Sequence, residues 1–267
     1  MSTIVCLHAH PDDEASSTGG TIARAAADGH RVVLVVGTDG DHGEVPDDLA
    51  TGEALIDRRR LETARSAEAL GVHRIVWLGY RDSGMTGWEQ NSHAEAFMLA
   101  PIDEAAEKLA AVLREENADV LTTYDWHGNY GHPDHVKVHH VGHRAADLAR
   151  TPKRFEATFN RDVLVRMMAQ APSELLEAAD FDPAGPADDG NPFGTSEAEI
   201  NLAVDVSAFV EQRRAALMAH ASQVTDTGQM LSMPDDVFRE MFGTEWYLEP
   251  GAPAGLRWGW LLDGLDR

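Results

Sequence analysis

Short apolar stretches alternate with longer, alanine-rich amphipathic stretches over the first 150 residues, and no other feature of the sequence constrains the fold as strongly. The apolar stretches are Ile4–Leu7, Val32–Val36, Arg74–Leu78 and Val120–Tyr124. The amphipathic stretches cover about residues 14–28, 53–70, 101–116 and 133–149. Strands that alternate with helices in this way indicate parallel βαβ units. We therefore expect an α/β, Rossmann-like fold, with a mostly parallel sheet and helices on both of its faces.

Two polar runs begin where strands of this sheet should end. The run His8–Glu14 follows the first apolar stretch, and Tyr130–His135 follows the fourth. In a doubly wound sheet with the strand order 3-2-1-4-5, the first and fourth strands are neighbours, and ligands bind outside their carboxyl ends. We therefore expect the two runs to open onto one crevice and to form a catalytic site there.

The two runs share one local layout, in which a proline follows a histidine. Proline is well suited to the first helical position, because its fixed φ matches the helix and its missing N–H has no partner there. Both runs should therefore open helices. Residues three apart face the same side of a helical turn, which brings together His10 with Asp13 and His132 with His135.

The length of 267 residues suits one large core, and the sequence contains no repeat or low-complexity linker. We therefore expect one domain over 1–267, with a Rossmann-like core at 1–150 and a less regular C-terminal elaboration at 151–267. In chain order the elaboration should contain a strand at Phe155–Phe159, a helix at Asn160–Gln170, a strand at Ile200–Val206, a helix from a Ser207 cap to about Ala219, and an edge strand at Trp246–Leu248.

One segment of the elaboration, residues 172–199, is acidic and rich in Pro and Gly, and it contains no Lys or Arg. Such a composition predicts a solvated loop. A flap over the active site is the alternative that we keep open for this segment.

The formal charge of −23 disfavours nucleic acid and anionic membrane surfaces as partners, because both would be repelled. A small neutral or cationic molecule is the expected partner, and a homo-oligomer is compatible with the composition. The lone cysteine, Cys6, lies in an apolar stretch, which predicts a buried thiol and a reducing compartment. Because we find neither a secretory leader nor an apolar stretch of about 20 residues, we expect a cytoplasmic protein.

The two runs together supply the side chains of a hydrolytic zinc site. A catalytic Zn²⁺ takes about three protein ligands and keeps one position for water. His10, Asp13 and His135 fit that count, and Asp12 is the candidate base that removes a proton from the attacking water. The oxyanion that forms needs a proton-donating group opposite the base. His132 suits that role, with Asp134 or another carboxylate to orient it.

The paired motifs His10-Pro11-Asp12-Asp13-Glu14 and His132-Pro133-Asp134-His135 resemble those of the PIG-L/LmbE family of zinc-dependent N-deacetylases. The resemblance covers most of the chain and is closest to the branch that contains the mycothiol-pathway deacetylase and the mycothiol S-conjugate amidase. It extends through Thr38–Glu44, Arg59, Glu62, Arg81–Met85, Tyr124-Asp125 and His220–Gln223.

The resemblance implies hydrolysis of an N-acetyl amide on an amino sugar or a related small molecule, with release of acetate and a primary amine. It assigns the zinc ligands to His10, Asp13 and His135, the base to Asp12, and the acid or electrophile to His132. It also implies that Tyr130 polarises the carbonyl and that Arg59 and Asp82 contact sugar or inositol hydroxyls.

Two positions bear on the substrate. Ser17 stands where sugar deacetylases of the family carry serine and the amidases carry lysine, which favours a deacetylase. Asp41 stands where the family usually has glutamate, so this expected substrate contact has a shorter side chain. The S-conjugate amidase reaction stays open, as does iron in place of zinc.

Other interpretations depend on single features. A non-catalytic zinc-binding scaffold would need the ligands without the acid and base. The start His8-x-His10-x-Asp12-Asp13 also resembles that of metallo-β-lactamases, but its last residue and the βαβ pattern disagree with that fold. A dinucleotide site would need glycines in the first turn, which this turn lacks. Arg59 lies between two arginines and could belong to a solvated helix face, and Asp82 could be only a turn former.

Overall fold

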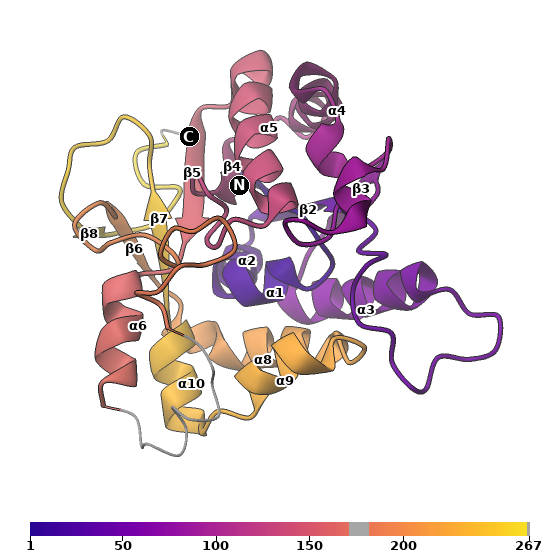
Figure 1. Cartoon of the computed structure of the whole chain (residues 1–267). Helices are drawn as coiled ribbons and strands as arrows, with labels where there is room; N and C mark the ends of the chain where they lie inside the picture. Colours follow the sequence, from indigo (N-terminus) through magenta and orange to yellow (C-terminus); the bar gives the residue numbers. More distant parts are fainter. Residues whose placement is uncertain (171–181, 266–267) are drawn as a thin grey trace.

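The computed structural model describes residues 1–170 and 182–265 and is built around a mixed eight-stranded sheet (Figure 1). The strands are β1 (Thr3–His8), β2 (Arg31–Thr38), β3 (Arg74–Tyr80), β4 (Val120–Tyr124), β5 (Lys153–Thr158), β6 (Leu202–Asp205), β7 (Thr244–Leu248) and β8 (Arg257–Trp258). Their order is β3-β2-β1-β4-β5-β7-β6-β8, and the first five are parallel. The predicted strand order 3-2-1-4-5 and the Rossmann-like fold class are confirmed.

Helices cover both faces of the sheet, as the right-handed crossovers of parallel strands require. One group packs around α2 and α3, with α8 against them, whereas α4 and α5 pack together on the other side (Figure 1). The helices are α1 (Asp13–Ser17), α2 (Gly19–Ala27), α3 (Leu55–Leu70), α4 (Ile102–Glu115), α5 (Pro133–Ala149), α6 (Arg161–Met168), α8 (Val210–Ala219), α9 (Val224–Leu231) and α10 (Asp235–Phe242). Short 3₁₀ turns lie at Glu89–Ser92, Phe97–Leu99 and Ser207–Phe209.

The central strand β1 is buried along its whole length, which fixes the position of the residues that follow it. Ile4 pairs with Val32 on one side and with Val120 on the other. Cys6 is also fully buried, and burial raises the pKa of its thiol to about 12. The thiol is therefore protonated and unreactive at neutral pH, which confirms the predicted core role of Cys6.

The expected continuous helix over 14–28 is instead two helices, because the helical conformation is interrupted at Thr18 between α1 and α2. A buried carboxylate from β7 explains where α2 begins. Glu245 accepts hydrogen bonds from the backbone N–H groups of Gly20 (2.8 Å) and Thr21 (2.9 Å), and it also accepts one from Arg213. Since the first N–H groups of a helix have no partner within it, this carboxylate caps α2 from a distant strand.

The C-terminal elaboration contains the expected strands and helices but joins them differently. The predicted edge strand Trp246–Leu248 is instead internal, because β7 lies antiparallel between β5 and β6, and β8 forms that edge of the sheet. Ser207 does not cap α8. Its hydroxyl bonds to Asp205 (2.7 Å), and the 3₁₀ turn that Ser207 begins precedes the helix.

Within the predicted acidic loop, residues 182–199 form no helix and no named strand, and residues 172–181 lie outside the described part of the chain. The division into a core and an elaboration within one domain stays a prediction. Among the described residues, no helix combines the length and apolar character needed to cross a bilayer.

Candidate active site

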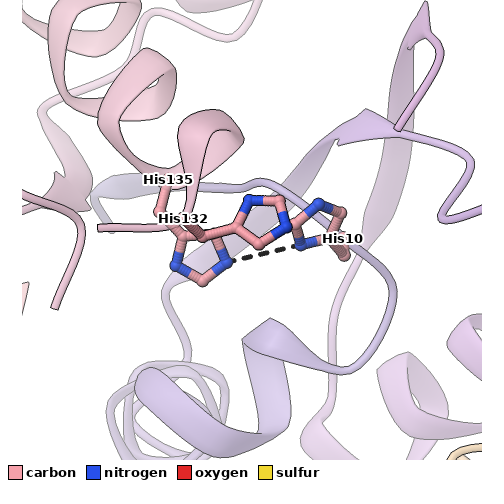
Figure 2. Close-up of side chains that lie close together, drawn as sticks. All are labelled: His10, His132 and His135. Atoms are coloured by element: carbon pink, nitrogen blue, oxygen red, sulfur yellow. Dashed lines mark hydrogen bonds between the residues drawn. The ribbon is translucent and has the colours of Figure 1, made fainter. Parts of the chain in front are cut away.

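The two polar runs meet at the carboxyl ends of β1 and β4. Figure 2 shows His10, from the segment after β1, facing His132 and His135 at the start of α5. Nδ1 of His10 lies 3.3 Å from Nε2 of His135, although 125 residues separate them along the chain. The expected convergence of the two runs is confirmed.

The second run has the predicted helical start. Pro133 is the first residue of α5, and the N-cap His132 accepts a hydrogen bond at Nδ1 from the backbone N–H of Asp134 (3.1 Å). One turn on, Nδ1 of His135 lies 3.2 Å from the Gly128 carbonyl. A carbonyl can only accept, so Nδ1 carries the proton and Nε2 of His135 keeps a lone pair that points toward His10.

The first run does not open a helix at its proline, so that part of the prediction is wrong. Pro11 lies in a turn, and α1 begins only at Asp13. Side-chain bonds hold this turn, since Asp13 accepts from the N–H of His10 (2.8 Å) and Glu14 accepts from that of Asp12 (3.0 Å). Asp12 adopts a left-handed backbone with φ of 98°, which is costly for most residues other than glycine.

Three potential ligand atoms form a nearly equilateral triangle at the centre of the site. Oδ2 of Asp13 lies 3.4 Å from Nδ1 of His10 and 3.4 Å from Nε2 of His135, and the third side is 3.3 Å. Zn²⁺ binds nitrogen and oxygen at about 2.0–2.2 Å in a tetrahedron, which places its ligands about 3.3–3.6 Å apart. The triangle therefore fits a zinc-sized ion bound at one face of the tetrahedron, with the fourth position left for water or substrate.

His132 offers an alternative third ligand, because His10, His132 and His135 also bring ring nitrogens within 4.8 Å of one another. Asp13 makes the tighter set with the two other histidines. It also supplies a negative charge that offsets the charge of a buried dication. We therefore favour Asp13 over His132 as the third ligand.

The electrostatics of the cluster separate the three histidines. Burial disfavours the charged form of His10, but the surrounding Asp82, Asp13 and Asp134 carboxylates outweigh it and raise its pKa well above the usual value. His132 behaves in the opposite way, since burial and the neighbouring His10 and His135 lower its pKa well below the usual value. His132 is therefore neutral, and because its Nδ1 accepts a hydrogen bond, its Nε2 carries the hydrogen.

Asp12 lies beside the triangle and lines the cleft. Burial raises the pKa of its carboxyl to about 6, against the opposing effect of the Arg59 guanidinium. Arg59 holds this segment in place, since it donates to Asp12 (3.0 Å) and to the carbonyls of Pro11 (2.5 Å) and Gly40 (2.7 Å). Arg59 is therefore a buried side chain that fixes the Pro11–Asp12 turn by hydrogen bonds, and it is not part of a solvated helix face.

Asp134 orients a histidine with its carboxylate, but this histidine is His10 and not His132, for which the sequence left Asp134 or another carboxylate open. The carboxylate lies 3.2 Å from Nε2 of His10 and accepts hydrogen bonds from the backbone and the hydroxyl of Ser83. These contacts fix the orientation of the His10 ring, so that its Nδ1 points toward Asp13 and His135. The short loop that contains Ser83 follows β3, so no local sequence signal linked it to Asp134.

The expected substrate-binding residues fall into two groups around a cleft of about 840 Å³. Ser17, Arg59 and Asp82 line the cleft, as does Tyr130, whose hydroxyl lies 3.5 Å from Nε2 of His135. Asp82 also forms a turn, because its carboxylate accepts from the N–H of Gly84 (2.8 Å). Asp41 does not line the cleft, since its carboxylate bonds to Arg81 and to the N–H of Asp82.

Further residues line the cleft that were not among the predicted site residues. Pro186, Asp188 and Phe193 from the acidic loop line the cleft, as do Met230 of α9 and Met233 after it. These residues lie far from both motifs in the sequence, and methionines at helical spacing are more typical of a core. The sequence kept open a flap at 172–199, and its described part supplies Pro186, Asp188 and Phe193, whereas no pattern pointed to the two methionines.

The His220–Gln223 segment holds neighbouring helices around the site, and Gln223 also lines the cleft. Nε2 of His220 lies 2.6 Å from Glu14, and Ser222 donates its N–H (2.9 Å) and its hydroxyl (2.6 Å) to Glu62. Burial lowers the pKa of His220, but the Glu14 carboxylate outweighs it and raises that pKa above its usual value. The resemblance included this segment, and its function is to hold α1 and α3 against α8.

A protein-family model described as PIG-L, GlcNAc-PI de-N-acetylase, matches residues 5–146, which are more than half of the chain and include both motifs. The chain belongs to the PIG-L family. This membership confirms the resemblance drawn from the motifs and makes the protein a deacetylase, an enzyme that hydrolyses linear amides.

Curated relatives place the chain within the family. It is 40% identical over 261 residues to a 1D-myo-inositol 2-acetamido-2-deoxy-alpha-D-glucopyranoside deacetylase of Acidothermus cellulolyticus, covering 93% of this chain and 88% of the relative. It is 38% identical to the enzyme of the same name from Thermobispora bispora, covering 94% and 89%. Among solved structures it resembles N,N'-diacetylchitobiose deacetylase from Pyrococcus horikoshii, with a TM-score of 0.52 and 26% identity over 89% of this chain and 73% of that one.

Proposed function

We propose that the protein is a zinc-dependent deacetylase that removes the acetyl group from an N-acetylglucosamine unit linked to inositol. The observation that carries this proposal is the triangle of His10, Asp13 and His135 beside Asp12, in a chain 38–40% identical to deacetylases of that class of substrate. A cleft of about 840 Å³ is large enough for a substrate of two rings. A cytoplasmic location belongs to the proposal, since the lone cysteine is a buried free thiol.

His10, Asp13 and His135 would hold the ion. When bound, Zn²⁺ supplies a Lewis acid that polarises the amide carbonyl and acidifies water. The surrounding bonds prepare these ligands, because the Gly128 carbonyl orients the His135 ring and Asp134 orients that of His10. Such outer contacts fix the tautomer and direction of ligating histidines.

The other residues of the cleft carry the proton transfers. Asp12 accepts the proton of the attacking water, since a carboxyl with a pKa of about 6 is ionised at neutral pH and is still basic enough to act. His132 is neutral with a hydrogen on Nε2, so it donates a hydrogen bond to the carbonyl oxygen as negative charge develops there. Tyr130 assists at the same oxygen. Asp12 then returns the proton to the amide nitrogen, the C–N bond breaks, and acetate and a primary amine are released.

Substrate binding divides along the structural groups. Ser17 and Asp82 line the cleft and are assigned to sugar or inositol hydroxyls. Arg59 also lines it, but both of its terminal nitrogens already donate to the protein, so we assign it to holding Asp12. We assign no direct substrate contact to Asp41. Its carboxylate accepts a hydrogen bond from the N–H of Asp82 and so fixes the loop that carries Asp82.

Amine release from a panel of amides tests this function. We expect N-acetylglucosaminyl-inositol to give the highest kcat/KM, ahead of N-acetylglucosamine and of a mycothiol S-conjugate. Faster cleavage of the S-conjugate would identify an amidase instead, and bound metal without turnover on any member would indicate a scaffold. Reconstitution of chelator-treated protein with zinc or with iron, followed by the same assay, identifies the metal that supports turnover.

The His132→Asn variant tests the hydrogen-bond donor. Loss of one donor to a developing oxyanion costs about 10²–10³-fold in kcat, and we expect a loss of that size here. Metal content should be unchanged, because His132 lies outside the favoured ligand set. Metal analysis beside steady-state kinetics checks both parts, and loss of zinc in this variant would instead place His132 among the ligands.

A further inference from the structure

A second group of metal-competent side chains lies on the same helix, farther along α5 and outside the cleft. His139 and His143 are one helical turn apart, and Glu156 faces them from β5. One ligand atom of each lies within 4.8 Å of the others. None of the three lines the catalytic cleft.

The fold brings these three side chains together through the packing of α5 on the sheet. Residues four apart share one face of a helix, which places the two imidazole rings 4.3 Å apart between their centroids. Oε1 of Glu156 lies 2.6 Å from Nε2 of His143 and 3.8 Å from Nδ1 of His139. His135 occupies the preceding turn of the same face, so both clusters use one stripe of α5.

Nδ1 of His139 contacts a backbone carbonyl, as Nδ1 of His135 does. In His139, Nδ1 lies 3.0 Å from the Tyr124 carbonyl, which can only accept, so Nδ1 carries the proton and Nε2 keeps its lone pair. Burial lowers the pKa of His139, which keeps the ring neutral. A backbone carbonyl that holds the second ring nitrogen is the usual outer contact of a metal-bound histidine.

His143 brings the second imidazole to the same carboxylate. Its Nε2 forms a 2.6 Å ion-pair contact with Oε1 of Glu156. Zinc ligands lie about 3.3–3.6 Å apart, so the two side chains would separate slightly when they share an ion.

We infer that His139, His143 and Glu156 form a second site for a divalent transition metal ion, with zinc as the probe. Two imidazoles and a carboxylate suit zinc and its neighbours, whereas magnesium and calcium prefer all-oxygen sites. The three side chains are 16%, 24% and 12% exposed, so an ion can reach them and water can complete its coordination. The inference stands apart from the proposed function, because no residue is shared.

Occupancy of this second site would tie α5 to β5 one turn beyond His135. An ion that binds only the folded chain stabilises it by mass action. The expected effect is therefore on stability and metal stoichiometry, with turnover unchanged.

Equilibrium dialysis of chelator-treated protein against zinc alone tests the inference. We expect the wild-type chain to bind two equivalents and His143→Asn to bind one, with Glu156→Gln as a second variant that also binds one. His140→Asn is the matched control, because His140 is an exposed histidine on the same helix outside the cluster, and it should bind two. The second equivalent should raise the thermal midpoint of the wild type and of His140→Asn only.

Two results would overturn the inference. One is saturation of the wild-type chain at a single equivalent of zinc that His143→Asn retains. The other is retention of the second equivalent by both His143→Asn and Glu156→Gln. Because the readouts are metal count and melting temperature, failure here leaves the amide-hydrolysis assays unaffected and is distinguishable from failure of the proposed function.

Discussion

Replacement of Asp12 by asparagine is expected to lower kcat by about 10²–10⁴-fold, the usual contribution of a positioned general base. The carboxylate lines the cleft beside the ligand triangle without contributing an atom to it. Metal content should therefore stay at the wild-type level. Metal analysis and kcat measured on the same preparation check the two parts of this prediction together.

Asparagine is the appropriate replacement because the backbone of Asp12 is left-handed. Asparagine tolerates this conformation better than most residues, and its amide oxygen can still accept from Arg59. Alanine would add backbone strain of about 1 kcal/mol and confuse folding with chemistry. Near wild-type turnover in Asp12→Asn would refute the assignment of the base, and loss of metal would move Asp12 into the ligand set.

Replacement of Asp13 by asparagine should abolish both metal binding and turnover. Its Oδ2 forms two sides of the ligand triangle, and its charge offsets that of the ion. Loss of an outer contact costs about 10–100-fold in metal affinity, so loss of a charged ligand should exceed 100-fold. The amide oxygen of asparagine can still accept from the N–H of His10, which preserves the turn.

Zinc affinity measured with a competing chelator checks this expectation. Asp41→Asn is a suitable control, because its carboxylate lies outside the cleft and bonds to Arg81, and this variant should retain zinc. Wild-type zinc affinity in Asp13→Asn, combined with loss in His132→Asn, would support the set of three imidazoles instead.

The sequence predicts the first five strands well, and the reason is physical. Parallel strands buried on both faces require continuous apolar runs, and Ile4–Leu7 and Val120–Tyr124 are such runs. The insertion of β7 between β5 and β6 could not be predicted in the same way. Antiparallel neighbours are selected by long-range packing, and Trp246–Leu248 looks the same from its own sequence at an edge or inside the sheet.

The site shows the same division between local and distant causes. Pro133 opens α5 as expected, because its helix start depends on the residues beside it. Pro11 does not, because Arg59, 48 residues away, bonds to its carbonyl and helps to hold the turn. The Asp134 carboxylate contacts His10 and Ser83 instead of His132. Ser83 comes from a loop that is distant in the sequence, so this contact could not be predicted locally. Sequence patterns predicted which residues converge, and tertiary contacts decided what each one touches.

The separation of the two motifs along the chain also has a consequence during synthesis. His10 leaves the ribosome 125 residues before His135, and the two rings meet only after β4 has paired with β1. A nascent chain of up to about half the final length therefore lacks a chelating pocket and cannot capture a stray cation from the cell. Uptake of the ion can thus report that β1 and β4 have paired.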